Sequence, residues 1–288
     1  MGLITTFDGI EHDSAEMLLK MIDDDFYYGY LGKQALSSSN LKLLLSSPKQ
    51  YVARLLGGSE SSQALRDGKL FHWRILEPDK FDALHIVEVA SKNTKTYKAA
   101  VEEFGEVYTR PEVDNAELLA EVLLANTEAA SFLEGAEFEV PAIAMIDGLA
   151  FRGKADIKKG TKIIDIKTTT EIQKFPYSAR KYSYDLQAAL YLELFPDAEE
   201  FVFLCIDKKT RDIAVYECSP EFIESGQEKL AKGIERYKFF FQGDVEVDQY
   251  VYYGTLWPEG LSRRRDDDMV WLRLRMFWVF STACRAVN

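Results

Sequence analysis

The sequence is poor in the residues that build several common kinds of site. Its 288 residues include only three cysteines, Cys205, Cys218 and Cys284, and no Cys-x-x-Cys pair. We therefore expect no disulfide framework, cysteine-bound zinc or iron–sulfur cluster, and we expect a reducing cytoplasm. The first residues lack a basic stretch followed by an apolar run, so no signal peptide is predicted.

Basic charge is also scarce. Lys and Arg number 35 against 47 Asp and Glu, which gives a formal net charge of -12. This balance disfavours a protein that coats nucleic acid with a broad basic surface. It leaves open an enzyme that holds DNA in one local basic channel and offsets part of its acid with divalent metal. Such a channel would be lined by Arg66, Lys154, Lys174, Arg180 and Lys181. The Trp- and Phe-rich run near the C-terminus is interrupted by arginines and is too polar for a membrane span, so no membrane partner is expected.

The sequence does contain alternating helix and strand patterns. A helix is predicted over 41–45, and Ser47-Pro48 starts it again to about residue 56. Further helices are predicted over 63–76 and 114–133, strands over 137–146, 149–157 and 162–167, a helix over 183–195, strands over 201–207 and 212–218, and a helix over 220–241. Asp147-Gly148 predicts a hairpin turn. This order indicates an α/β or α+β domain with a central mixed sheet flanked by helices.

The domain boundaries follow from composition. We predict an N-terminal extension over 1–34 with little regular structure, a domain over 35–245 and a C-terminal tail of unclear role over 246–288. Residues 168–181 are predicted to be a polar, partly basic loop. The tail, with three arginines directly before three aspartates at 263–268, is interpreted as a peripheral extension, with an oligomer contact as the alternative.

One stretch of two strands carries the candidate chemistry. Side chains alternate along a strand, so Asp165 and Lys167 project to one face while Ile164 and Ile166 project into a core. Asp156 lies on the preceding strand, and we expect these acids and the lysine to gather on a sheet edge. The alternative is an ordinary surface ion pair.

Phosphodiester hydrolysis needs an activated water and a stabilised leaving oxygen. Divalent metal provides both, and hard oxygen ligands hold Mg²⁺. Asp156, Asp165 and the Ile166 carbonyl are candidate ligands. Lys167 is a candidate for orienting or deprotonating the water, or for stabilising the charged phosphorane.

Other candidates come from neighbouring elements. His72 is predicted to face inward from a helix, on the same face as Leu65 and Ile75. It is either a metal ligand or anchor or an ordinary core histidine. Glu139 lies one strand before Asp156. Gln187 and Tyr191 share one helix face, either at the site or as ordinary surface and core residues.

At these residues the sequence resembles the PD-(D/E)xK nuclease superfamily, in particular the phage and prophage exodeoxyribonuclease VIII (RecE-like) family, related to lambda exonuclease and RecB-type nuclease domains. The matching stretches span about residues 35 to 242. They are Ser38-Ser39-Asn40-Leu41, Ser47-Pro48-Lys49-Gln50-Tyr51, Gly68-Lys69-Leu70-Phe71-His72, Leu76-Glu77-Pro78-Asp79-Lys80-Phe81, Gly153-Lys154-Ala155-Asp156, Asp165-Ile166-Lys167-Thr168-Thr169, Ile172-Gln173-Lys174-Phe175, Tyr184, Gln187, Ala188, Tyr191 and Phe201-Val202-Phe203-Leu204.

The resemblance implies a role for each matching residue. Asp156 and Asp165 correspond to the metal-binding acids, Lys167 to the catalytic lysine and His72 to a histidine that joins the metal site. Gln187 and Tyr191 resemble a Gln-x-x-x-Tyr motif that positions the active site or the DNA strand. Glu139 resembles the first-strand glutamate, with Glu137 as the alternative. A restriction-endonuclease-like core is the implied fold.

The implied activity is Mg²⁺-dependent digestion of linear double-stranded DNA, 5′ to 3′, with Mn²⁺ as a substitute ion. A single-strand annealing recombination protein and a ring-like trimer or tetramer are the implied partners, and the bacterial host cytoplasm is the implied location. Two alternatives remain: a single-strand-specific or endonucleolytic enzyme of the same fold, and a non-catalytic DNA-binding protein.

Overall fold

The computed structural model describes residues 2–57 and 62–253. One compact unit extends from Met1 to Asp244, and a second, Val245–Asn288, is described only as far as Tyr253, including the 3-10 turn η4 (Val247–Gln249). The predictions for the charged tail at 263–268 lie outside the described residues.

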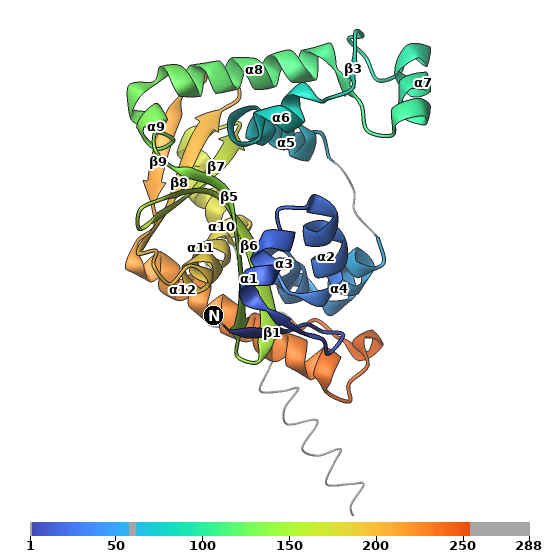
Figure 1. The fold of residues 1–288 in the computed structure, drawn as a ribbon, viewed down its shortest axis with the longest axis vertical. Helices are drawn as coiled ribbons and strands as arrows, with labels where there is room; N and C mark the ends of the chain where they lie inside the picture. Colours follow the sequence, from blue (N-terminus) through green and yellow to red (C-terminus); the bar gives the residue numbers. More distant parts are fainter. Residues whose placement is uncertain (1, 58–61, 254–288) are drawn as a thin grey trace, which may run out of the picture. The chain divides into compact units, whose positions relative to one another are not determined.

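A five-stranded mixed sheet forms the centre of the first unit, in the order β5-β6-β7-β8-β9 (Figure 1). Its strands are β5 (Glu137–Ile146), β6 (Leu149–Lys159), β7 (Lys162–Thr169), β8 (Glu200–Asp207) and β9 (Ile213–Glu217). β7 pairs parallel with β8, and the other neighbours pair antiparallel. The Asp147-Gly148 hairpin has positive φ at both positions (49° and 80°), as a type I′ turn requires. The predicted fold class is confirmed.

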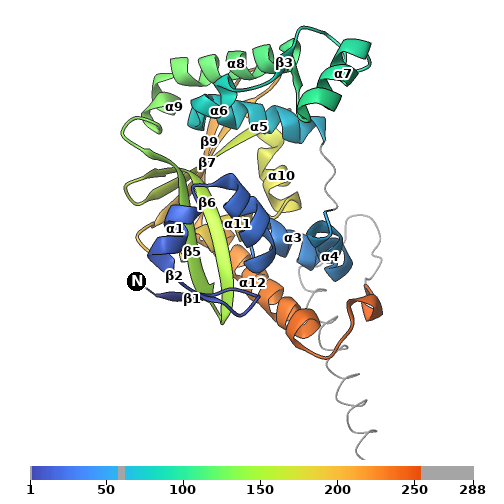
Figure 2. The ribbon, with the colours of Figure 1, turned by 45° about the vertical axis from the view of Figure 1, so that its right-hand side comes forward.

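Helices cover both faces of this sheet (Figures 1 and 2). One face packs against α3 (Ser38–Ser46), α10 (Phe175–Lys181), α11 (Tyr184–Leu194) and α12 (Pro220–Tyr237). The other packs against α5 (Gln63–Leu76), α8 (Arg110–Ala125) and α9 (Thr127–Ser131). Along β7, Ile163 joins the first core while Ile164 and Ile166 join the second, so the predicted alternation is correct.

The remaining elements connect these layers. They are α4 (Pro48–Leu55), α6 (Pro78–Asp82), β3 (Ile86–Val87), α7 (Lys95–Phe104), β4 (Tyr108–Thr109), η2 (Ile172–Lys174) and η3 (Lys238–Gln242). None of the helices in the described ranges has the length and apolar character needed to cross a membrane.

The N-terminal residues correct the expectation of little regular structure. They form β1 (Leu3–Thr5), β2 (Glu11–Asp13), α1 (Ser14–Lys20), a π-helix η1 (Asp25–Tyr30) and α2 (Leu31–Gln34). Met17, Met21 and Leu31 are fully buried in a core that Ile143 and Ala150 of the β5–β6 hairpin complete. The apolar residues of this segment therefore bind it to the sheet, and it belongs to the same compact unit.

Three further expectations are corrected. β7 is the central strand, not a sheet edge. The predicted loop at 168–181 contains α10, with Pro176 in its first turn and Phe175 stacked on Tyr216 at 4.9 Å between ring centroids. Leu65, predicted to face inward on α5, is 65% exposed, because Leu70 and Phe71 form the buried side of that helix instead.

Candidate active site

The site begins where β6 and β7 separate. Their backbone pairing ends at Ile157 and Ile164. Beyond this point the Ile166 amide donates to the Asp156 Oδ2 atom at 2.9 Å, so a side chain replaces the missing backbone partner. The separation of the strands makes room for the Asp156 carboxylate between them, and the amide fixes its position.

His72 reaches this position from the middle of α5. In the present rotamer its Nε2–H donates to the Ile166 carbonyl at 2.8 Å, while Nδ1 faces Asp156 Oδ2 at 3.6 Å. A backbone carbonyl commonly orients a metal-binding histidine in this way. The Ile166 carbonyl, predicted as a ligand, thus serves here as the acceptor that orients His72.

Glu139 occupies the β5 position opposite Asp156. Phe138 pairs with Ile157 and Val140 with Ala155, so Glu139 and Asp156 face each other in register, but the ladder skips this pair. The reason is a left-handed backbone at Glu139 (φ 51°), a conformation that non-glycine residues adopt with strain and that recurs at functional sites. Glu137, the alternative first-strand acid, is exposed and pairs with Lys158.

These three side chains form a candidate divalent-metal site. One ligand atom each from His72, Glu139 and Asp156 lies within 4.8 Å of the others. Burial, then the charge of Asp156, raises the pKa of Glu139 to about 8, and burial also raises the pKa of Asp156. Two half-buried acids that repel each other beside a histidine fit a cation with oxygen and nitrogen ligands.

Asp165 lies outside that group of three and has its own partners. Gln187 Nε2 donates to Asp165 Oδ1 at 2.6 Å, and Lys167 forms an ion pair with Oδ2. Asp165 is 3% exposed, and its buried Oδ2 accepts no well-directed hydrogen bond. Its cation in this structure is the Lys167 ammonium, and the charge of Asp165 contributes to the raised pKa of Asp156.

Lys167 lies between the acids and an aromatic ring. Its ammonium is 5.3 Å from the centroid of the Tyr184 ring. Burial alone would lower the pKa of Lys167, but the carboxylates of Asp165 and Asp156 outweigh it and raise the pKa above its ordinary value. Lys167 is therefore a cation in this arrangement, which favours charge stabilisation over proton abstraction.

Tyr191 supports the site through the backbone. Its hydroxyl donates to the Lys154 carbonyl at 3.0 Å, two residues before Asp156. A Cβ at Gly153 would lie 2.8 Å from Leu194 Cδ1 and 3.3 Å from the Tyr191 ring. The absence of a side chain at Gly153 thus allows α11 to lie directly on β6.

The architecture has known counterparts. Residues 37–249 match the family model described as a PDDEXK-like domain of unknown function (DUF3799). The chain belongs to this family. The predicted membership of the PD-(D/E)xK superfamily is thereby confirmed. No curated protein matches the chain.

Two solved structures are similar to the chain to different degrees. A candidate exonuclease of Eubacterium rectale superposes with a TM-score of 0.59 at 14% identity, over 81% of this chain and 95% of its own. A phage-related exonuclease of Haemophilus somnus 129PT matches at 17% identity over 52% of this chain and 88% of its own, with a TM-score of 0.30. The first of these likenesses shows a shared fold. Family and fold together support a nuclease.

The PDDEXK-like site has a charged border that the sequence did not reveal. Asp24 of the N-terminal segment pairs with Lys80 at 2.5 Å and Lys154 at 3.2 Å. Lys154 and Arg66 were predicted to line a basic channel. Lys154 is 9% exposed and held by Asp24, and Arg66 is held by Glu112 at 3.2 Å. Both are therefore neutralised. Only the acidic run at 23–25 gave a signal for this border.

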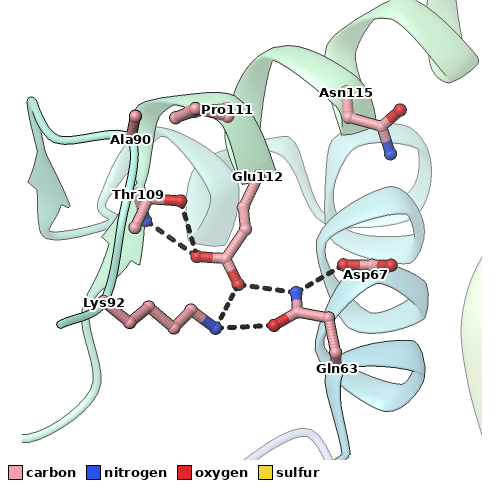
Figure 3. Close-up of a pocket in the computed structure, with 8 residues that line it drawn as sticks. All are labelled: Gln63, Asp67, Ala90, Lys92, Thr109, Pro111, Glu112 and Asn115. Atoms are coloured by element: carbon pink, nitrogen blue, oxygen red, sulfur yellow. Dashed lines mark hydrogen bonds and ion pairs between the residues drawn. The ribbon is translucent and has the colours of Figure 1, made fainter.

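A pocket of the PDDEXK-like domain lies elsewhere. It measures about 340 Å³ and lies near the N-terminal end of α5, lined by Gln63, Asp67, Ala90, Lys92, Thr109, Pro111, Glu112 and Asn115 (Figure 3). Glu112 accepts hydrogen bonds there from Gln63 at 2.8 Å and from the Thr109 amide at 2.9 Å. Its polar groups bond mainly to one another, so we interpret it as a brace between α5 and α8.

Proposed function

We propose that this chain is a divalent-metal-dependent exonuclease that hydrolyses linear double-stranded DNA, 5′ to 3′, and leaves 3′ single-stranded tails for phage-type recombination. The observation that carries the proposal is the meeting of His72, Glu139 and Asp156 beside the Asp165–Lys167 pair. Acids, a histidine and a lysine at separated central strands are the groups that metal-assisted phosphodiester hydrolysis requires.

His72, Glu139 and Asp156 would hold the metal, with the buried Asp165 carboxylate and its Lys167 partner nearby. A bound Mg²⁺, or Mn²⁺ in its place, supplies Lewis-acid stabilisation and a more acidic water. The protein's own residues position the reaction: Gln187 orients Asp165 at 2.6 Å, and Lys167 places a fixed positive charge against the phosphate oxygens.

The finer parts of the proposal rest on resemblance. The Eubacterium rectale protein with the same fold is named as an exonuclease, which supports action from DNA ends. A single-strand annealing recombination protein as partner, a ring-like trimer or tetramer and a cytoplasmic location follow from the RecE-like resemblance, and they are part of the proposal.

The decisive experiment offers two duplexes of equal sequence, one linear and one covalently closed. With Mg²⁺ we expect the linear duplex to disappear while the closed circle persists, and we expect EDTA to stop the reaction. A duplex labelled at one 5′ end or one 3′ end reports polarity from the first labelled product. Linear DNA that survives long incubation with either Mg²⁺ or Mn²⁺ would refute the proposal.

A second candidate is a nuclease of the same fold that acts on single strands or internally. The observation that favours it is a pair of exposed aromatic rings, Tyr177 (65% exposed) on α10 and Tyr182 (52%) at its C-terminal end, since exposed rings stack with unpaired bases. Nicking of the closed circle, or faster loss of a single strand than of a duplex, would select this candidate. Retained DNA binding with no metal binding in calorimetry would instead indicate a non-catalytic protein.

A further inference from the structure

Lys42 of α3 lies beside the candidate active site although it is distant in sequence. Ser37 and Asn40 form a capping box that starts α3. Leu41 and Leu44 are fully buried and fix the rotation of the helix. As a result the Lys42 ammonium lies 5.0 Å from the centroid of the Tyr184 ring, the ring that Lys167 approaches at 5.3 Å.

Lys42 has no acidic partner of its own. Within residues 2–57 and 62–253 it forms no ion pair or hydrogen bond, whereas Lys167 is paired with Asp165. Burial, then repulsion from Lys167, lowers the pKa of Lys42 to about 8. Lys42 is half-buried, and Asp165 and Asp185 attract its charge without forming an ion pair with it. Removing a cation from water without a direct partner is unfavourable, so an anion from outside the chain would stabilise this arrangement.

An exposed aromatic ring continues the same surface. The Tyr182 ring is 6.1 Å from the Tyr184 ring between centroids, and Tyr182 is 52% exposed. The Lys181 ammonium lies 5.4 Å from the Tyr182 centroid, and this lysine is also exposed. Tyr184 thus joins Lys167 and Lys42 on one side to Tyr182 on the other.

We propose that Lys42 and Tyr182, joined through Tyr184, form a subsite for one nucleotide of a nucleic-acid strand next to Lys167, in which Lys42 binds a backbone phosphate and Tyr182 stacks with a base. This proposal rests on the proposed nuclease function and specifies how the same site holds its substrate. A phosphate supplies the anion that Lys42 lacks, and stacking with a base explains why the large Tyr182 ring is exposed to solvent.

The competing explanation is that the aliphatic stem of Lys42 simply covers Tyr184. Lys42→Met distinguishes phosphate binding from simple packing on Tyr184, because methionine keeps an unbranched apolar stem and removes the charge. Lys42→Arg restores the charge. Lys98→Met is the matched control, since Lys98 is an exposed lysine on α7, between β3 and β4 (Figure 1).

The experiment measures binding without cleavage. Fluorescence anisotropy follows a labelled single-stranded oligonucleotide and a blunt duplex, with Ca²⁺ in place of Mg²⁺, from ~50 to ~200 mM salt. For Lys42→Met we expect about tenfold weaker binding and a salt slope smaller by roughly one, with both values largely recovered in Lys42→Arg and unchanged in Lys98→Met. For Tyr182→Ala we expect about tenfold weaker binding of the single strand at an unchanged salt slope.

The outcomes separate the subsite from the proposed function. If the wild-type protein binds DNA and cleaves it with Mg²⁺ while Lys42→Met keeps the wild-type affinity and salt slope, the subsite is refuted and the nuclease stands. If Lys42→Met loses affinity without losing salt slope, the loss does not come from a phosphate contact, and the phosphate role is also refuted. A wild-type protein that neither binds nor cleaves DNA refutes the proposed function itself.

Discussion

Helix α5 carries two groups of polar residues with opposite character. Toward its N-terminus, Glu112 of α8 is met by Gln63, Arg66 and Lys92, with donor–acceptor distances from 2.7 to 3.2 Å. In the middle of α5, His72 faces Asp156, with Glu139 close by. Both groups are half-buried or buried acids beside one helix, yet their acid–base properties diverge.

The divergence follows from the partners. At Glu112 burial alone would raise the pKa, but the hydrogen bonds from Gln63, Lys92 and Thr109 outweigh it and lower the pKa to about 2. At Glu139 burial and the neighbouring Asp156 raise the pKa to about 8. The first group is complete within the chain and stabilises the fold. In the second, neither Glu139 nor Asp156 forms an ion pair with a lysine or arginine of the described residues, and a metal ion would complete the group.

The largest effect should come from removing a charge of the incomplete group. Asp156→Asn removes one carboxylate charge of the His72–Glu139–Asp156 set, so we expect nuclease turnover to fall on the order of 10³-fold and calorimetric Mn²⁺ binding to weaken strongly. The matched control is Glu112→Gln, which should leave Mn²⁺ affinity unchanged. Equal Mn²⁺ affinity in the wild-type and Asp156→Asn proteins would contradict the assignment of the site.

A second change separates metal binding from catalysis. Lys167→Ala leaves His72, Glu139 and Asp156 in place, so we expect Mn²⁺ affinity to stay within a few-fold while kcat falls on the order of 10²-fold. DNA binding with Ca²⁺ should persist. Undiminished cleavage by Lys167→Ala would remove the role given to its charge.

The pH dependence of stability should have opposite signs at the two acids. In EDTA, the raised pKa of Glu139 means that the folded state binds more protons than the unfolded state between about pH 4.5 and 8, so the free energy of unfolding falls as pH rises through this range. Glu139→Gln should remove on the order of 2 kcal/mol of this decline, measured by urea unfolding.

For Glu112 we expect the opposite dependence of the free energy of unfolding on pH. Its lowered pKa contributes stability that is fully present above about pH 4.5 and is lost as pH falls toward 2. Glu112→Gln should therefore lower the free energy of unfolding by about 2 kcal/mol at pH 7 and have little effect near pH 2. If both variants changed the pH dependence of stability with the same sign, the pKa values of Glu112 and Glu139 would not be shifted in opposite directions.

The smallest effect concerns the support behind the site. Tyr191→Phe removes the hydrogen bond to the Lys154 carbonyl, and we expect the free energy of unfolding to fall by about 1 kcal/mol. Mn²⁺ affinity should change little, because Asp156 keeps its own bond from the Ile166 amide. A large loss of Mn²⁺ affinity would show that the incomplete group depends on α11 as well as on α5.

Much of the sheet could be predicted because local signals agree with the fold. Asp147-Gly148 needs positive φ, and the isoleucines of β7 alternate between two cores, so strand positions and facing followed from the sequence. α10 was missed because its polar residues conceal one apolar anchor, Phe175, which packs against distant strands. Tertiary contact, not local preference, stabilises that helix.

Part of the candidate site could also be predicted from the sequence. The spacing of Asp165 and Lys167 on one strand indicates that their side chains share a face. The left-handed backbone of Glu139 and the approach of Lys42 to Tyr184 could not be predicted, since both arise only when separate elements come together. Asp24 likewise reaches Lys154 across 130 positions of sequence.

The N-terminal segment has a practical consequence for the limits of a folding unit. The family match begins at residue 37, yet the π-helix before it buries Tyr27 against Arg152, with 4.3 Å between guanidinium and ring. A chain shortened to start at the family boundary would uncover Ile143 and Ala150 and leave Lys154 without its carboxylate partner. The family match therefore begins inside the folding unit, and a stable protein for biochemistry needs the residues before position 37 as well.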